Sequence, residues 1–257
     1  MRISLVQDTI FWADKTANLQ KVSRQLALLA GETDLVVLPE MFTTGFCTNE
    51  LKLAETLEGE TVRMLKTWAV QFNLAIAGSF IATENDKIYN RAFFVFPSGE
   101  FQTADKRHLF SMGDEHLHFS SGEKRMIVNF CGFNICLLVC YDLRFPVWAR
   151  NVNNEYDLLI FVANFPERRI DVWDILLKAR AIENQSYVCG VNRIGTDGLG
   201  IAYNGHSAIF DFKANPLLTF PENNTAIQTT QLTIESLQLF RQKFAVWKDA
   251  DGFEIKV

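Results

Sequence analysis

The stretch NICLLVCYDLRFP (134–146) is an apolar run that ends in a cysteine, with Tyr141, Asp142 and Arg144 close behind it. A short apolar run closed by polar residues is typical of a strand buried on both faces. Cys140 stands at the last apolar position, where the strand passes into a loop. In open α/β sheets ligands bind outside the carboxyl ends of the strands. We therefore interpret Cys140 as a thiol placed to meet a substrate.

Strands and amphipathic helices alternate on both sides of this stretch. We expect strands at 2–7, 34–40, 74–81 and 157–164, and helices at 18–31, 60–73, 171–185 and near 234–243. Two hairpins are expected, with turns at 97–99 and near Gly132. In the helix at 171–185 the residues predicted to face inward are Val172, Ile175, Leu176, Ala179 and Ile182. This order of elements predicts an α/β layered fold with a mixed sheet, formed by residues 1–257 as one domain.

The composition narrows the classes of function. The chain has 257 residues, of which 48% are hydrophobic, and its 25 basic and 30 acidic residues are well mixed, with a formal charge of −5. No basic stripe indicates nucleic acid as a partner, and no apolar run is long enough to cross a membrane. The five cysteines are odd in number and no export signal precedes them, so we expect free thiols in the cytoplasm.

A cysteine nucleophile needs a base and a donor for the oxyanion that it generates. Glu40 closes the apolar run DLVVLPE as Cys140 closes its own, and a carboxylate desolvated there has a raised pKa and becomes a usable base. Lys106 could stabilise the oxyanion, with the backbone N–H of Tyr141 as a second donor. Glu115 could orient the lysine or the base.

Four segments resemble, in order, the signature segments of the nitrilase (carbon–nitrogen hydrolase) superfamily: LVVLPEMFTTGF, ADKRHLF, CYDLRFP and LLKARAIENQSYV. The resemblance runs over essentially the whole chain and is strongest to the bacterial omega-amidases, which act on 2-oxoglutaramate and 2-oxosuccinamate. It implies an αββα sandwich that often forms dimers or larger homo-oligomers. It also implies Glu40 as general base, Lys106 as oxyanion stabiliser, Cys140 as nucleophile and Glu115 as the second glutamate of the family.

The same resemblance implies cysteine-dependent hydrolysis of a small ω-amide through a thioester, with no metal and no organic cofactor. Phe165 departs from it, because NFP stands where these amidases often carry NWP, and this puts the shape of the pocket in question. A dicarboxylate monoamide also needs a cation for its far carboxylate. Arg168 and Arg169 follow another strand end, and we favour Arg169. The aromatic walls are expected from Phe42, Phe46, Phe110, Phe165 and Trp173.

Three alternatives remain open on these residues. The chain could be another amidase, a nitrilase or a carbamoylase, because all of these use the same catalytic residue types. It could be a hydrolase of the Cys–His type with His108 or His206 as base. It could also be a binding protein that has kept the fold, although the presence of all four candidate catalytic residues argues against this.

Overall fold

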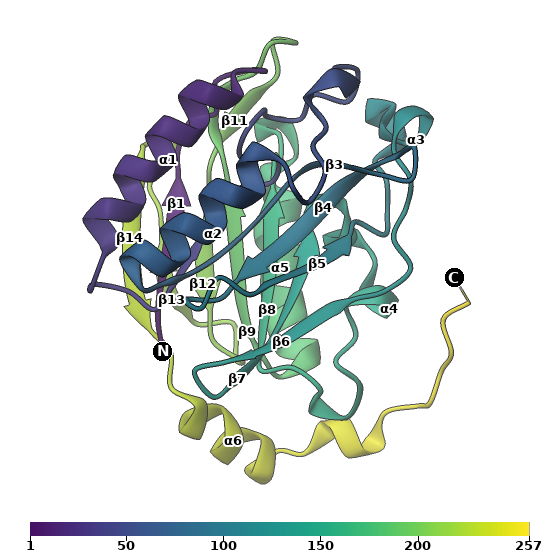
Figure 1. The fold of residues 1–257 in the computed structure, drawn as a ribbon. Coiled ribbons are helices and arrows are strands. Elements are labelled where there is room, and N and C mark those ends of the chain that lie inside the picture. Colours follow the sequence, from purple (N-terminus) through teal and green to yellow (C-terminus); the bar gives the residue numbers. More distant parts are fainter. Residues whose placement is uncertain (257) are drawn as a thin grey trace.

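Two six-stranded sheets pack face to face, and helices cover the outer face of each (Figure 1). The computed structural model describes residues 1–256. The predicted αββα sandwich is confirmed. Among the described residues, none of the helices combines the length and the apolar character that a membrane span requires.

The first sheet has the order β14–β1–β2–β3–β4–β5. Its strands are β1 (Arg2–Gln7), β2 (Leu35–Val37), β3 (Ala75–Glu84), β4 (Lys87–Val95), β5 (Phe101–Asp105) and β14 (Ala226–Gln231). The central strand β2 runs parallel to both of its neighbours, and the other pairs are antiparallel. The outer face is covered by α1 (Lys15–Leu29) and α2 (Glu60–Phe72).

The second sheet has the order β13–β12–β9–β8–β7–β6. Its strands are β6 (Met126–Phe130), β7 (Phe133–Val139), β8 (Leu158–Ala163), β9 (Tyr187–Asn192), β12 (Ala208–Phe210) and β13 (Pro216–Thr219). Strands β7, β8 and β9 are parallel. The remaining elements are the hairpin β10 (Ile194–Thr196) and β11 (Ala202–Asn204), and the helices α3 (Glu115–His118), α4 (Pro146–Ala149), α5 (Ile170–Asn184) and α6 (Ile234–Lys243).

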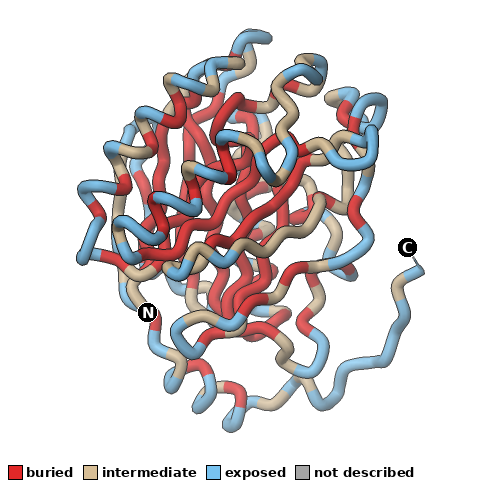
Figure 2. Tube along the Cα trace, viewed as in Figure 1, coloured by how far each residue is buried: buried red, intermediate tan, exposed pale blue. Residues whose placement is uncertain are grey.

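Buried residues fill the interior, drawn red in Figure 2, and the three largest apolar clusters are stacked as layers. One apolar cluster lies between the two sheets, one between the first sheet and helices α1 and α2, and one between the second sheet and helices α4 and α5. The middle strands are therefore covered on both faces. This explains why their sequences are continuous apolar runs without alternation.

Most of the predicted elements are confirmed. Helix α1 forms and buries Leu19, Val22, Leu26 and Leu29, and α6 and β1 have the expected bounds. Strand β2 is shorter than its apolar run, since regular pairing ends at Val37. Both hairpins form, and the second turns through Cys131 and Gly132, whose positive φ angles of 49° and 79° suit a two-residue hairpin turn.

The predicted inward face of α5 is wrong at Ile175 and Ile182, whereas Val172 and Leu176 do pack, half-buried, against the apolar cluster under the helix. Ile175 and Ile182 are 64% and 57% exposed. The residues that face the second sheet are Trp173, Leu177, Arg180, Ala181 and Asn184, whereas Val172, Leu176 and Ala179 are only half-buried. The helix carries two apolar stripes. The one that packs inward includes an arginine, which donates a hydrogen bond to the carbonyl of Leu143 at 2.6 Å.

Candidate active site

The four candidate catalytic residues come from both sheets. Glu40 follows β2 and Cys140 follows β7, each beyond the carboxyl end of a parallel strand, while Lys106 follows the edge strand β5 and Glu115 begins α3. The two sheets pack with these ends close together, so residues far apart in the chain meet at one place.

A buried cluster of charges lies at that place. The Lys106 ammonium donates to Glu40 Oε1 at 3.0 Å and to the two Glu115 oxygens at 3.0 and 2.9 Å. All three side chains have no exposed surface. Buried charges are tolerated only when they are paired and hydrogen-bonded. The arrangement therefore holds one cation between two carboxylates.

Two asparagines that we did not predict complete the cluster. Asn90 on β4 donates to Glu40 Oε1 at 2.7 Å and to Glu115 Oε1 at 3.1 Å. Asn164, directly after β8, donates its backbone N–H to Glu40 Oε2 at 2.8 Å and its side-chain amide to the Glu40 carbonyl at 2.8 Å. The sequence offers a weak signal for each, since an amide side chain interrupts or closes an apolar strand.

Burial and the neighbouring charges raise the pKa values of Cys140, Lys106 and Glu115, with a different balance of causes for each. Burial raises the pKa of the Cys140 thiol well above its ordinary value, and the negative charge of Glu40 adds to this, while Lys106 opposes it. Burial by itself would lower the pKa of Lys106, but the charges of Glu115 and Glu40 outweigh it and raise that pKa. Burial also raises the pKa of Glu115, against the opposing effect of Lys106. The lysine is thus permanently charged, and the thiol needs a base to lose its proton.

Cys140 faces a cavity of about 340 Å³ that has room for a small molecule. Its backbone is left-handed, with φ 46°, which turns the side chain out of the alternation of β7. The cavity is lined by residues from five regions of the chain: Phe46, Thr48, Lys106, Phe110, Met112, Gly113, Cys140, Tyr141, Arg144, Asn164, Phe165, Pro166, Arg168, Arg169, Asp197, Leu199, Ile201 and Tyr203. Glu40 and Glu115 are absent from this lining and lie behind it.

Of the residues expected to contact the substrate, Tyr141, Phe165 and Arg169 line this cavity. Phe42 lies elsewhere. It is 2% exposed and packs against Phe93 in the layer between the first sheet and its helices. The backbone of Met41, directly before it, is left-handed, with φ 45°, so the chain turns between Glu40 and Phe42.

The other predicted wall residues divide in the same way. Phe46 and Phe110 line the cavity, whereas Trp173, on the inward face of α5, is fully buried and does not line it. Tyr203 and Leu199, from the β10–β11 hairpin and its loop, form a wall that we did not predict. The β10–β11 segments are too short to show a periodic pattern, so the sequence does not indicate that they reach the cavity.

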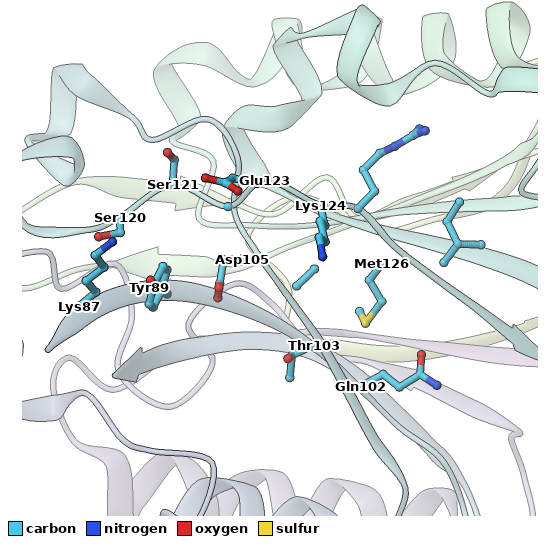
Figure 3. A pocket seen from close by; sticks show the side chains of 14 residues that line it. Lys87, Tyr89, Gln102, Thr103, Asp105, Ser120, Ser121, Glu123, Lys124 and Met126 are labelled. Carbon is cyan, nitrogen blue, oxygen red and sulfur yellow. The ribbon is translucent and has the colours of Figure 1, made fainter. Parts of the chain in front are cut away.

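A larger groove, of about 580 Å³, lies along β4, β5 and the segment that leads into β6 (Figure 3). Its lining is polar and includes Lys87, Asp105, Glu123 and Lys124. None of the four candidate catalytic residues lines it. The smaller cavity at Cys140 is therefore the candidate active site.

The two histidines considered as alternative bases have other partners. His108 Nδ1 lies 2.8 Å from Asp142 Oδ1, and His206 Nδ1 lies 2.8 Å from Asp174 Oδ2. Neither is among the residues that line the cavity. In residues 1–256 no group of three or more His, Cys, Asp and Glu side chains is arranged to hold a metal ion.

Comparison with known proteins assigns the chain to a family. The carbon–nitrogen hydrolase family model matches residues 2–242. The omega-amidase YafV of Escherichia coli strain K12 is 43% identical over 255 residues, which are 99% of this chain and 98% of that protein. The 2-oxoglutaramate amidase of Bacillus subtilis is 33% identical over 216 residues, 81% of this chain and 82% of that protein.

A solved structure agrees with this assignment. XC1258 from Xanthomonas campestris, described as a CN-hydrolase superfamily protein with an arsenic adduct in the active site, superposes with a TM-score of 0.97 at 40% identity, covering 100% of this chain and 99% of that one. The fold is that of a carbon–nitrogen hydrolase. The chain belongs to this family, within the nitrilase superfamily, and is an enzyme that hydrolyses amides.

We expect Lys106→Met to destabilise the protein strongly, because it leaves two buried carboxylates without their cation. Breaking a buried ion pair costs about 3–5 kcal/mol. The pKa of Glu115 is already raised in the folded state, and losing Lys106 raises it further. A carboxyl group with a raised folded pKa binds its proton more tightly when folded, so the folded variant is favoured at low pH and loses stability as the pH rises.

Urea unfolding at about pH 5 and about pH 8 measures this effect. The loss in free energy of unfolding should be larger at the higher pH. The exposed Lys52, paired only with Glu50 at the surface, provides the control Lys52→Met, which should change little at either pH. If Lys106→Met lost the same free energy of unfolding at both pH values, the electrostatic explanation would be contradicted.

Proposed function

We propose that the protein hydrolyses the ω-amide of small dicarboxylate monoamides, such as 2-oxoglutaramate and 2-oxosuccinamate, to the acid and ammonia. The observation that carries the proposal is the position of Cys140 and Lys106 in one small cavity, with Glu40 bound to Lys106 behind it. The similarity to the E. coli omega-amidase and the B. subtilis 2-oxoglutaramate amidase supports this substrate class.

In the first half of the proposed reaction, Glu40 takes the proton from Cys140 as the sulfur attacks the amide carbon. The base is needed because the pKa of the thiol is raised well above its ordinary value. Lys106 and the backbone N–H of Tyr141 stabilise the oxyanion. Two of the three Lys106 contacts go to the same Glu115 carboxylate, so one ammonium proton can turn toward the oxyanion while Glu115 still holds the lysine.

In the second half, the tetrahedral intermediate expels ammonia, which receives its proton from Glu40, and a thioester to Cys140 remains. Glu40 then removes a proton from a water molecule that attacks the thioester, and the acid leaves as the thiol is restored. Throughout, Glu115 keeps Lys106 in place. Its position behind the cavity, bonded also to the backbone N–H of Phe110 at 2.6 Å, suits this supporting role.

Arg169 is the proposed partner of the far carboxylate. It lines the cavity, packs over the ring of Phe110 at 5.0 Å, and forms no ion pair with a carboxylate of residues 1–256. Burial lowers its pKa, and the positive charges of Arg168 and Arg144 add to this effect. The one carboxylate of the lining, Asp197, already accepts hydrogen bonds from Leu199, Ile201 and Tyr203. A substrate anion would therefore enter a site with excess positive charge.

We also propose a homodimer that pairs through α5. Ile175 and Ile182 lie seven positions apart on the outer face of this helix and are 64% and 57% exposed, and a contact with a second copy would remove these apolar side chains from water. The five cysteines are all free, which is in keeping with the proposed cytoplasmic location.

A substrate panel with two base variants tests the reaction. Ammonia release should be fastest with 2-oxosuccinamate and 2-oxoglutaramate, compared with aliphatic nitriles and carbamoyl amino acids. Cys140→Ala and Glu40→Gln should each lower kcat by at least about 1,000-fold, because nucleophile and base act as one unit. His206→Ala is the matched control and should retain activity. Activity that survives Glu40→Gln and is lost in His206→Ala would overturn the mechanism.

Arg169→Ala should raise the KM for 2-oxosuccinamate by about tenfold or more, since a hydrogen bond to a charged group contributes about 1.5–3 kcal/mol. Arg168→Ala, which removes a more exposed guanidinium from the same cavity, is the control and should have a smaller effect. Steady-state kinetics on both variants makes the comparison. An unchanged KM in Arg169→Ala would remove this residue from the substrate site.

Ile182→Asp should convert the dimer to a monomer, because it places a charge in the proposed apolar interface. Leu28→Asp on α1 is the control, since Leu28 is 77% exposed on a helix that is not part of that interface. Sedimentation velocity should show a dimer for the wild type and for Leu28→Asp. A monomeric wild type, or a dimeric Ile182→Asp, would refute pairing through α5.

A further inference from the structure

One buried carboxylate joins the two chain segments that carry Lys106 and Cys140. Asp142 is 1% exposed and accepts three N–H groups. Its Oδ2 accepts the backbone N–H of Val139 at 3.1 Å, and its Oδ1 accepts the backbone N–H of His108 at 2.9 Å. The third donor is His108 Nδ1, at 2.8 Å from the same oxygen. Asp142 thus connects the residue before the nucleophile to a residue two positions after the lysine.

The bond to Val139 spans Cys140, whose backbone is in the left-handed region with φ 46°. For a residue with a side chain this conformation costs free energy, and it persists only where its surroundings hold it. Asp142 supplies part of that support from the carboxyl side of the turn. Whatever fixes Asp142 therefore also fixes the direction in which the thiol points.

The His108 ring is itself held from two sides. It stacks on Phe145 with ring centroids 3.6 Å apart and an angle of 3° between the planes, and it meets Trp148 edge-on at 6.1 Å. A carboxylate only accepts hydrogen bonds, so Nδ1 carries the proton that points to Asp142. The imidazole is therefore a fixed donor. His108 does not line the cavity, so its role differs from that of a base that contacts the thiol directly.

We propose that His108 is a positioning residue, which through Asp142 sets the placement of Cys140 relative to Lys106. This rests on the proposed role of Cys140 as nucleophile. The reacting groups come from two different sheets, and a misplacement of about 1 Å between such groups can cost about 100-fold in rate. The His108–Asp142 contact is a direct polar connection between the segments that carry them.

Two variants separate the donor from the ring. His108→Asn keeps an N–H the same number of bonds from the backbone as Nδ1, and removes the stacked ring. His108→Phe keeps a flat ring against Phe145 and removes the donor. We expect kcat to fall by about 10- to 100-fold in His108→Phe, with KM within about threefold of the wild type. His108→Asn should retain kcat within about threefold.

Alkylation of Cys140 gives a readout that needs no substrate. It is measured with iodoacetamide in a Cys131→Ser background, because Cys131 is the exposed thiol of the chain. His108→Phe should slow the modification of Cys140 at least about fivefold, and His108→Asn should leave it near the wild-type rate. If the proposed substrates prove wrong, this measurement still decides the positioning role, and kcat is read on whichever amide the wild type hydrolyses.

The thermal midpoint of each variant shows whether it is folded. If His108→Phe fails to fold, His108→Ala replaces it in the comparison with His108→Asn. Three outcomes would overturn the proposal. The first is a wild-type kcat and a wild-type rate of Cys140 alkylation in His108→Phe. The second is equal impairment of His108→Phe and His108→Asn, and the third is a change in His108→Phe that affects only KM.

Discussion

The Lys106 ammonium between two buried carboxylates is the interaction on which the site depends. Each of Glu40 and Glu115 would carry a large desolvation penalty alone, and the lysine would carry one too. Together with the amide of Asn90 they satisfy one another. The cluster can therefore remain charged in the interior, which keeps a carboxylate and an ammonium beside the Cys140 thiol.

The sandwich architecture brings this cluster together. Strand β2 is parallel to its neighbours in one sheet, and β7, β8 and β9 are parallel in the other, so Glu40, Cys140 and Asn164 all follow carboxyl ends. The apolar layer between the sheets fixes their relative placement. Asn164 then bonds directly to Glu40, across the two sheets, at 2.8 Å. Packing thus provides the precision that the chemistry requires.

The polar surroundings of Cys140 show how support is layered behind a site. Asp142 holds the turn that carries the thiol, and Arg180 on α5 binds the carbonyl of Leu143 in the same turn. Both side chains are buried, and neither lines the cavity. The turn is therefore fixed from the lysine segment and from the outer helix at once.

The sequence by itself determined the order of strands and helices, the two hairpins, and the four candidate catalytic residues, because apolar periodicity and motif order are local properties of the chain. It did not determine which stripe of α5 packs inward, since both stripes have helical spacing and only the partner sheet and the Leu143 carbonyl distinguish them. It did not place Phe42 either, because the direction of that side chain depends on the left-handed backbone at Met41, which the residue pattern does not show. The roles of Asn90 and of the β10–β11 hairpin were decided by the tertiary structure alone, because their partners are distant in the chain and meet only when the two sheets pack.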